Sequence, residues 1–536
     1  MINPRLLIIV LGLAISAVFY LIIYVLIKYG PKFYRFTKSI AASLGLALIK
    51  NEYIAGFLST HQQIAIFLKK RSNRRSFWGL NATVLGLAFL YTLFAFLGLI
   101  EDFITSAPIV AADVRLNNLL LLFRSDYYVR IFLAITTLGR AEIIISVTAI
   151  ISLLFWLWRQ KSYILPLWLS LIGSSLLSFL SKLAFERPRP PLAVYTETSF
   201  SFPSGHATAA VAFYGFLIYF LLRHTRRLLN KTFILLIGLA LILALGFSRL
   251  YLGVHYLSDV LAGYLLGALW LILGISFSEW QLDRNQKSAA TRDVPDKTKA
   301  NLRIKLITII LLLAEMGFSL YFALHYRPAR PEIAAESPVF VADIFSLPVR
   351  FTLPHYTETI TAASQEPLSF MVSAPSDESL IADFRQSGWL LADPINDESL
   401  GKAARAALFN QPYPDAPMTP SFWNGETHTF GFEKATRDNS IRERNHARFW
   451  KTNIKTGSGN TIYVGTVSLD TGLKWGVTHR IAPDIDTERE RLFQDLESSG
   501  KIMDYRKENF VPPLLGRNFT GDQFFTDGQI YMLILK

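Results

Sequence analysis

The chain has 536 residues, of which 51% are hydrophobic and only 18% are charged, a composition that excludes intrinsic disorder, collagen and coiled coil. Because cysteine is absent, disulfide scaffolds, cysteine nucleophiles and thiolate metal sites are excluded as well. The net charge of +13 is uneven: residues 327–536 carry 22 basic and 27 acidic side chains, and the preceding part carries 32 and 14. Since the basic part is also the apolar part, the charge favours a membrane protein over a nucleic-acid binder.

Apolar runs long enough to cross a bilayer as helices recur through the first 326 residues. They lie near 6–27, 79–100, 137–158, 163–184, 206–222, 232–249, 257–278 and 304–325. The first run is too long for a signal peptide, and no small-residue cleavage site follows it, so we expect it to remain as a span. These runs predict an all-α polytopic membrane helix bundle.

The connections between these runs predict the orientation of the bundle. Four of them are basic, and they fall on one face if every run crosses: 28–78, 159–162, 223–231 and 279–305. Short basic loops are typical of the cytoplasmic side. The connections 101–135, 185–205 and 250–256, together with the whole tail after 325, are then expected outside. The apolar stretches 39–49 and 53–68 could instead dip into the membrane, which leaves the topology of the first span open.

The tail predicts a soluble α+β domain. Helical patterns and strand patterns alternate with glycine-containing turns in this part of the chain. Helices are expected at 376–386, 397–409 and 486–499, and strands at 446–454, 461–469 and 473–481. The expected domains are therefore 1–78, a membrane span with a basic loop; 79–278, a six-helix core; 279–326, a linker with a last span; and 327–536, the soluble domain.

Ionisable side chains are rare in the apolar part, and three groups of them lie where the predicted spans end on the outer face. Their patterns are KxxxxxxRP from Lys182 to Pro190, PSGH from Pro203 to His206, and SRxxxxxHxxxD from Ser248 to Asp259.

The cations of these groups suit a phosphate. Lys182, Arg189 and Arg249 bring three positive charges together, and arginine can bind phosphate oxygens in bidentate fashion. Ser204 and Gly205 precede a predicted helix, so free backbone N–H groups and the positive end of the helix dipole add to the same site.

The histidines of these groups suit phosphoryl transfer. His255 and Asp259 are four residues apart and share a helix face, so the carboxylate can fix the tautomer and leave the other ring nitrogen as a nucleophile. His206 has no evident partner and could protonate the leaving oxygen. The cations could stabilise the transferring group, so no metal and no cofactor are required.

The three patterns together, in this order and spacing, resemble the type-2 phosphatidic acid phosphatase superfamily, which shares its site with vanadium haloperoxidases. The resemblance covers residues 79–278 and implies a six-helix phosphatase core with one extra span at each end. It implies that His255 forms a phosphohistidine, that Asp259 orients it and that His206 is the general acid. The phosphate-binding roles that it implies fall on Lys182, Arg189, Ser204, Gly205 and Arg249.

The tail resembles the LssY-type C-terminal domain, through Arg444 to Trp450, Thr478 to Arg480 and the acidic residues that follow. That family implies a bacterial source, and it implies no activity. Arg442, Arg444, His446 and Arg448 would share one strand face, which we interpret as solvated rather than as an anion site. A metal site of His446, His479, Asp484 and Asp486 is a weaker alternative, because the spacing matches no compact ligand motif.

We therefore expect a lipid phosphatase of the bacterial inner membrane whose site and tail face the periplasm. Candidate substrates are undecaprenyl pyrophosphate, which we place first, phosphatidylglycerophosphate, phosphatidate and lipid A phosphates. A lipid phosphotransferase that uses the same site, a haloperoxidase, and a membrane-anchored scaffold with a partner-binding tail stay as alternatives. The expected partners are the lipid phosphate, the bilayer and a periplasmic partner or ligand of the tail, and no nucleic acid.

Overall fold

The computed structural model describes the chain except for residues 1–23, 26–27, 31, 34, 41, 48–49, 74–75, 107, 290–301, 330–336, 348–352, 410, 437–442, 475–477 and 519. It divides into two compact units. A helical unit spans Gly12–Thr105 and Ser125–Pro331, and a strand-rich unit joins Glu332–Lys536 with Ser106–Arg124 and Met1–Leu11. The expected span at 6–27 lies almost wholly outside the described residues.

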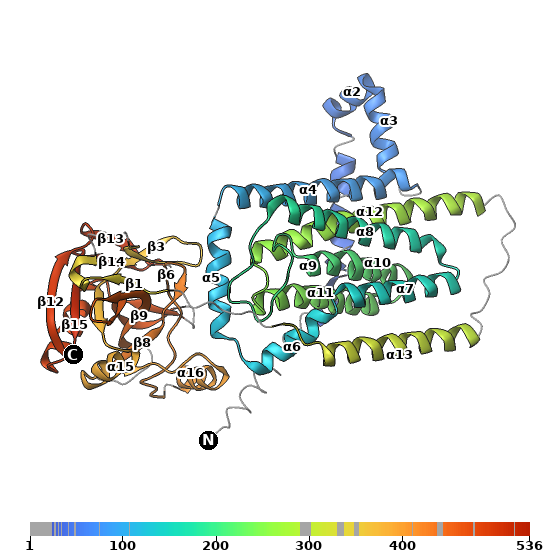
Figure 1. The fold of residues 1–536 in the computed structure, drawn as a ribbon. Coiled ribbons are helices and arrows are strands. Elements are labelled where there is room, and N and C mark those ends of the chain that lie inside the picture. The colour runs from blue at the N-terminus through green and yellow to red at the C-terminus, as the bar shows by residue number, and fades with distance from the viewer. Residues whose placement is uncertain are drawn as a thin grey trace. The chain divides into compact units, whose positions relative to one another are not determined.

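Most helices of the helical unit run side by side in Figure 1, whereas α2 and α3 project away from the others. In chain order they are α2 (Glu52–Thr60), α3 (Gln62–Arg71), η1 (Phe77–Asn81), α4 (Ala82–Ile104), α6 (Asp126–Thr137), α7 (Ala141–Leu157), η2 (Lys161–Tyr163), α8 (Ile164–Phe185), α9 (Gly205–Ala209), η3 (Ala210–Tyr214), α10 (Gly215–His224), α11 (Leu228–Tyr251), α12 (Leu257–Ala289) and α13 (Leu302–His325). Among the described residues, six helices are long and apolar enough to cross a membrane, or seven if the bent pair α6–α7 counts as one. The expected all-α membrane bundle is confirmed, and the chain is a multi-pass membrane protein.

The centre of this unit is α12, which packs against α8, α4 and α9. Close approach depends on glycine: a Cβ atom at Gly263 would lie 2.6 Å from the carbonyl oxygen of Ser204. That contact holds the start of α9 against α12. The expected span 137–158 corresponds to α7, whereas α6 lies almost wholly in the segment 101–135 that was expected as an outer connection. The two helices meet at an angle of 43°.

The last span, α13, packs against α7 and α6. Its buried Glu315 accepts hydrogen bonds from Ser146 Oγ at 2.9 Å and from Ser319 Oγ at 3.2 Å. A carboxyl group inside an apolar span needs such partners. Ser146 on α7 and Ser319 on α13 itself provide them.

The strand-rich unit is built on a nine-stranded sheet with the order β12-β15-β4-β10-β9-β8-β5, in which β1 also pairs with β9 and β11 with β10. Its strands are β1 (Val339–Val341), β4 (Phe370–Ala374), β5 (Leu390–Leu391), β8 (Phe430–Ala435), β9 (Glu443–Thr456), β10 (Thr461–Lys474), β11 (Thr478–Ile481), β12 (Ile502–Asn509) and β15 (Gln529–Leu535). Smaller sheets contain β2 (Tyr356–Glu358), β3 (Ser364–Pro367), β6 (Phe422–Trp423) and β7 (Glu426–Thr427), and separately β13 (Leu514–Arg517) and β14 (Gln523–Thr526).

Both faces of the large sheet are covered. On one face α15 (Asp377–Gln386) and α17 (Asp486–Ser498) bury a core around Phe384, Trp389 and Phe449. On the other face η4 (Ile344–Ser346) and β6 cover a second core around Trp450 and Met532. A further helix, α16 (Asp397–Phe409), completes the unit. The predicted α+β tail is confirmed, with helix bounds within one residue of those expected.

One helix of the strand-rich unit comes from the segment expected to be an outer loop of the bundle. This helix, α5 (Pro108–Leu122), donates a hydrogen bond from Asn118 to the carbonyl oxygen of Gly425 at 3.0 Å. Arg115 on the same helix forms an ion pair with Glu358. The soluble unit therefore includes residues that precede most of the bundle in the chain.

Candidate active site

The three sequence motifs meet in the helical unit. Lys182 lies in the last turn of α8, Ser204 and Gly205 begin α9, and Arg249 lies in the last turn of α11. His255 follows in the short connection before α12, and Asp259 lies in the first turn of α12. Every residue that the sequence predicted for this site is therefore at a helix end or in a connection next to one.

His255 is buried beside Asp259. The two side chains are 1% and 0% exposed, and His255 Nδ1 lies 3.4 Å from Asp259 Oδ2. The other ring nitrogen, Nε2, faces Arg189 Nη1 at 3.2 Å. Burial, reinforced by Arg189 and Arg249, lowers the pKa of His255 well below its usual range. The imidazole is therefore neutral at pH 7, with one nitrogen toward a carboxylate and the other toward a cation.

Asp259 collects several donors besides His255. The backbone N–H of Tyr256 donates to it at 2.8 Å, and Ser201 Oγ donates to the same oxygen. Arg187 Nη1 donates to its second oxygen at 2.6 Å and also to Ser258 Oγ at 2.7 Å. The guanidinium carbon of Arg187 lies 4.9 Å from the Phe103 ring centre and 4.2 Å from that of Tyr256. These contacts fix the carboxylate in position.

Two arginines converge on one carboxylate, Glu197. Arg189 Nη2 lies 2.9 Å from Glu197 Oε2, and the fully buried Arg249 pairs with Glu197 Oε1. Although burial acts in the opposite direction, Arg249 and Arg189 hold the pKa of Glu197 well below its usual range. Arg249 also donates to Thr136 Oγ1 at 2.7 Å and to the hydroxyl of Tyr195. Glu197 therefore offsets part of the positive charge of Arg189 and Arg249.

Some polar atoms of the predicted site are buried without a hydrogen-bond partner in the part of the chain that the structure describes. They are Ser204 Oγ, His206 Nε2 and Arg249 Nε. Buried polar groups are nearly always satisfied in folded proteins, so each unsatisfied one calls for an explanation. Oxygen atoms of a bound phosphate group would provide partners for these atoms.

Four residues of the site were missed from the sequence: Arg187, Tyr195, Glu197 and Ser201. Arg187 is the neighbour of Arg189 in the Arg-Pro-Arg-Pro segment, and a second arginine beside a predicted cation was the one signal present. The other three lie in the irregular connection 186–204, whose path the sequence does not predict.

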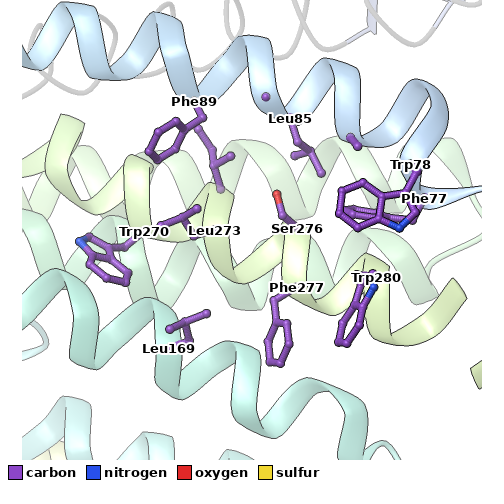
Figure 2. Close-up of a pocket in the computed structure, with 13 residues that line it drawn as sticks. Phe77, Trp78, Leu85, Phe89, Leu169, Trp270, Leu273, Ser276, Phe277 and Trp280 are labelled. Carbon is purple, nitrogen blue, oxygen red and sulfur yellow. The ribbon is translucent and has the colours of Figure 1, made fainter. Parts of the chain in front are cut away.

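A separate apolar pocket of about 740 Å³ lies between η1, α4, α8 and α12 (Figure 2). Figure 2 shows the rings of Phe77, Trp270, Phe277 and Trp280 around it. None of its lining residues carries a charge, and none belongs to the predicted site. Its lining fits hydrocarbon but not a phosphate group, so the polar cluster remains the candidate active site.

The interpretation of the polar strand in the tail as solvated is wrong. Arg444 and His446 are 5% and 3% exposed, because β9 lies inside the sheet and both faces of that sheet are covered. Arg442 and the side chain of His479 lie outside the described residues. The described residues contain no group of three metal-ligating side chains.

The comparisons with known proteins agree with the two-part organisation. Residues 163–283 match the family described as PAP2 superfamily, and residues 350–530 match the family described as LssY C-terminus. Phosphatidylglycerophosphatase B of Bacillus subtilis (strain 168) is 33% identical over 191 residues, which are 35% of this chain and 94% of that protein. The bacitracin transport permease protein BcrC of Bacillus licheniformis is 37% identical over 111 residues, which are 20% of this chain and 49% of that protein.

Two solved structures are also similar. The first is a transmembrane PAP2 type phosphatidylglycerolphosphate phosphatase from Bacillus subtilis, at 31% identity and a TM-score of 0.32, covering 36% of this chain and 96% of that one. The second is LpxE of Aquifex aeolicus, at 24% identity and a TM-score of 0.24, covering 30% and 94%. Since one-third of the residues are identical across almost the whole of a curated relative, the chain belongs to the PAP2 superfamily of membrane lipid phosphatases, and it carries an LssY C-terminal domain.

Proposed function

We propose that this protein removes a phosphate group from a membrane lipid through a phosphohistidine on His255, at the periplasmic face of the bacterial inner membrane. The observation that carries the proposal is the arrangement of His255, with Asp259 at Nδ1 and Arg189 at Nε2. A neutral imidazole can act as a nucleophile through the lone pair of its unprotonated nitrogen. Here that nitrogen faces the cations that would bind the phosphate, so it is placed to attack phosphorus.

In the proposed reaction the substrate phosphate lies among Lys182, Arg189 and Arg249, with the N-terminus of α9 contributing backbone N–H groups. His255 Nε2 attacks phosphorus in line with the lipid oxygen that leaves, and Asp259 stabilises the positive charge that develops on the ring. His206 gives the leaving oxygen a proton. Water then attacks the phosphohistidine, which releases inorganic phosphate and restores His255.

The lipid is identified by a panel of substrates. Purified protein is offered phosphatidylglycerophosphate, undecaprenyl pyrophosphate, phosphatidate and a lipid A phosphate, and both free phosphate and phosphorylated products are measured. Phosphatidylglycerophosphate is included because the B. subtilis relative is named for it. Release of free phosphate from at least one lipid is expected. Transfer of the phosphoryl group to an acceptor in place of water would instead favour a phosphotransferase, and turnover of none would contradict the proposal.

The proposed role of His206 predicts a dependence on the leaving group. We expect His206→Ala to slow hydrolysis of a lipid phosphate by about 10²- to 10⁴-fold, because an alkoxide needs a proton to leave. With p-nitrophenyl phosphate, whose leaving group needs no proton, the loss is expected to be much smaller. The measurement is the steady-state rate on each substrate. An equal loss of rate on both substrates would show that His206 is not the general acid.

Glu197 is expected to compete with phosphate for Arg189 and Arg249. Glu197→Gln removes one negative charge from that cluster, so inorganic phosphate should inhibit more strongly, with an inhibition constant about tenfold lower, or about 1.4 kcal/mol. The control is Glu186→Gln, at an exposed residue in the same connection. An unchanged or higher inhibition constant in Glu197→Gln would show that this carboxylate does not compete.

The proposed orientation can be tested because the chain contains no cysteine. A membrane-impermeant maleimide applied to spheroplasts should label Ser458→Cys, at an exposed turn of the tail, but not Ser72→Cys, at the exposed end of α3. Both variants should be labelled after lysis. The basic loops support this orientation, and labelling of Ser72→Cys alone in intact spheroplasts would reverse it.

A further inference from the structure

A second polar cluster lies inside the strand-rich unit, on one face of the large sheet. The register of β8, β9 and β10 places Glu433, His446 and Ser468 directly across from one another, and Arg444 across from Asp470. All five side chains are at most 7% exposed. Burying so many ionisable groups is costly unless their arrangement serves a purpose.

Three of these residues place a hydroxyl, an imidazole and a carboxylate next to one another. Ser468 Oγ lies 3.0 Å from His446 Nε2, and His446 Nδ1 lies 3.1 Å from Asp470 Oδ1. Burial lowers the pKa of His446 to about 4, although Asp470 acts in the opposite direction. The ring is therefore neutral at pH 7 and can accept the proton of the serine hydroxyl.

Neighbouring side chains hold Ser468, His446 and Asp470 in place. Arg444 forms an ion pair with Glu433 at 2.5 Å, and its Nε lies 4.0 Å from the second oxygen of Asp470. Since Arg444 is thus engaged mainly by Glu433, Asp470 keeps an oxygen for His446. An acid that orients the imidazole from Nδ1, while Nε2 faces a hydroxyl, is the arrangement that activates serine in hydrolases.

These three side chains face a cavity and are not enclosed in the packed core. Ser468, His446 and Asp470 all line a pocket of about 350 Å³, a size that admits a small organic molecule. Its other walls combine the apolar side chains of Leu119, Ile360, Phe422 and Ile481 with polar ones, which include Glu358, Gln365, Glu366 and Asn518. Arg448 also lines it, and its buried Nε has no hydrogen-bond partner in the described part of the chain. The pocket thus combines apolar side chains, a cation and the hydroxyl group of Ser468.

We propose that Ser468, His446 and Asp470 form a second active site, which hydrolyses small carboxylic esters whose acyl group fits this pocket. Ser468 Oγ attacks the carbonyl carbon and gives its proton to His446 Nε2. His446 then gives that proton to the alcohol oxygen as the C–O ester bond breaks, and the acyl group stays on Ser468. Water, deprotonated by His446, releases the acid and restores the serine.

Arg448 has a role in this reaction that follows from its position. It lies on β9 opposite Thr466 of β10. Because Thr466 is two residues from Ser468, Arg448 and Ser468 are on the same face of the sheet. A fixed cation at this place would stabilise the negative charge that develops on the carbonyl oxygen. The site is independent of the phosphatase chemistry of the helical unit, because it shares no residue with it.

The first test needs no variant. Full-length protein in detergent is treated with a fluorophosphonate, which reacts with activated serines, and the modified peptide is identified by mass spectrometry. We expect the adduct on Ser468. Absence of an adduct there, while a serine hydrolase in the same mixture is labelled, would overturn the proposal.

The second test measures hydrolysis of p-nitrophenyl butyrate. We expect Ser468→Ala to lower kcat/KM by about 10³-fold or more, and Ser458→Ala, at an exposed turn serine close in sequence, to leave it unchanged. Thermal unfolding of each variant is followed, so that loss of the fold is recognised. Hydrolysis by a folded Ser468→Ala at the wild-type rate, or no hydrolysis by the wild type, would contradict the proposal.

Discussion

His255→Ala is expected to abolish phosphate release, with a loss of about 10⁶-fold, the scale found when a covalent nucleophile is removed from an enzyme. The reason is positional. The imidazole is 1% exposed and stands between Asp259 and Arg189. No other described residue of the site presents a neutral ring nitrogen to Arg189, so no neighbour can replace it.

A matched control is His224→Ala, at an exposed histidine at the end of α10, for which phosphate release should stay unchanged. Wild-type protein quenched during turnover of a labelled lipid should carry a phosphoryl group on the peptide that contains His255, in an acid-labile and base-stable linkage. His255→Ala should carry none. A variant that retains substantial phosphate release would exclude His255 as the nucleophile, whatever the labelling shows.

The membrane helices were predictable because a span is defined by its composition over about 20 residues, and the exact path of the chain does not matter. Helix α6 was not predicted, because Asp126 and Arg130 interrupt its apolar residues and it is shorter than the run of about 20 that defines a span. Helix α5 was also missed. Its polar residues Arg115 and Asn118 make it resemble an outer loop, although both are buried and have partners within the strand-rich unit.

The phosphatase site shows the same division. Lys182, Arg189, His206 and His255 stand in short motifs, and the structure brings these motifs together at one place as the sequence predicts. Glu197 depends on how an irregular connection folds back onto two arginines, and no local pattern encodes that path.

The prediction that the polar strand of the tail is solvated failed for a different reason. Alternation along β9 indicates which residues share a face of the sheet, but not whether that face is covered. The structure covers it, which changes Arg444 and His446 from solvated side chains into buried groups. The contact of His446 with Ser468 further depends on the register between β9 and β10, which a single strand cannot reveal.

Asp259→Asn is expected to reduce phosphate release by about 10⁴-fold while leaving His255 in place. The loss of a triad aspartate in a serine protease has that magnitude, because the imidazole then adopts the wrong tautomer. Here the asparagine could donate its amide to Nδ1, which would place the ring proton on Nε2, the atom that must attack. The measurement is the rate of phosphate release at saturating lipid.

Asp259 has a second role that must be separated from this one, since it also pairs with Arg187 in a buried site. Breaking that pair from either side leaves a buried charge without its partner, at a cost of about 3–5 kcal/mol in stability. Arg187→Gln therefore provides the control: it breaks the same ion pair and should destabilise the bundle to a similar extent, but it leaves the contact between Asp259 and His255. Its loss of activity should be much smaller than that of Asp259→Asn. If the two folded variants lose activity equally, the carboxylate serves the fold and not the nucleophile, because the change they share is the broken ion pair.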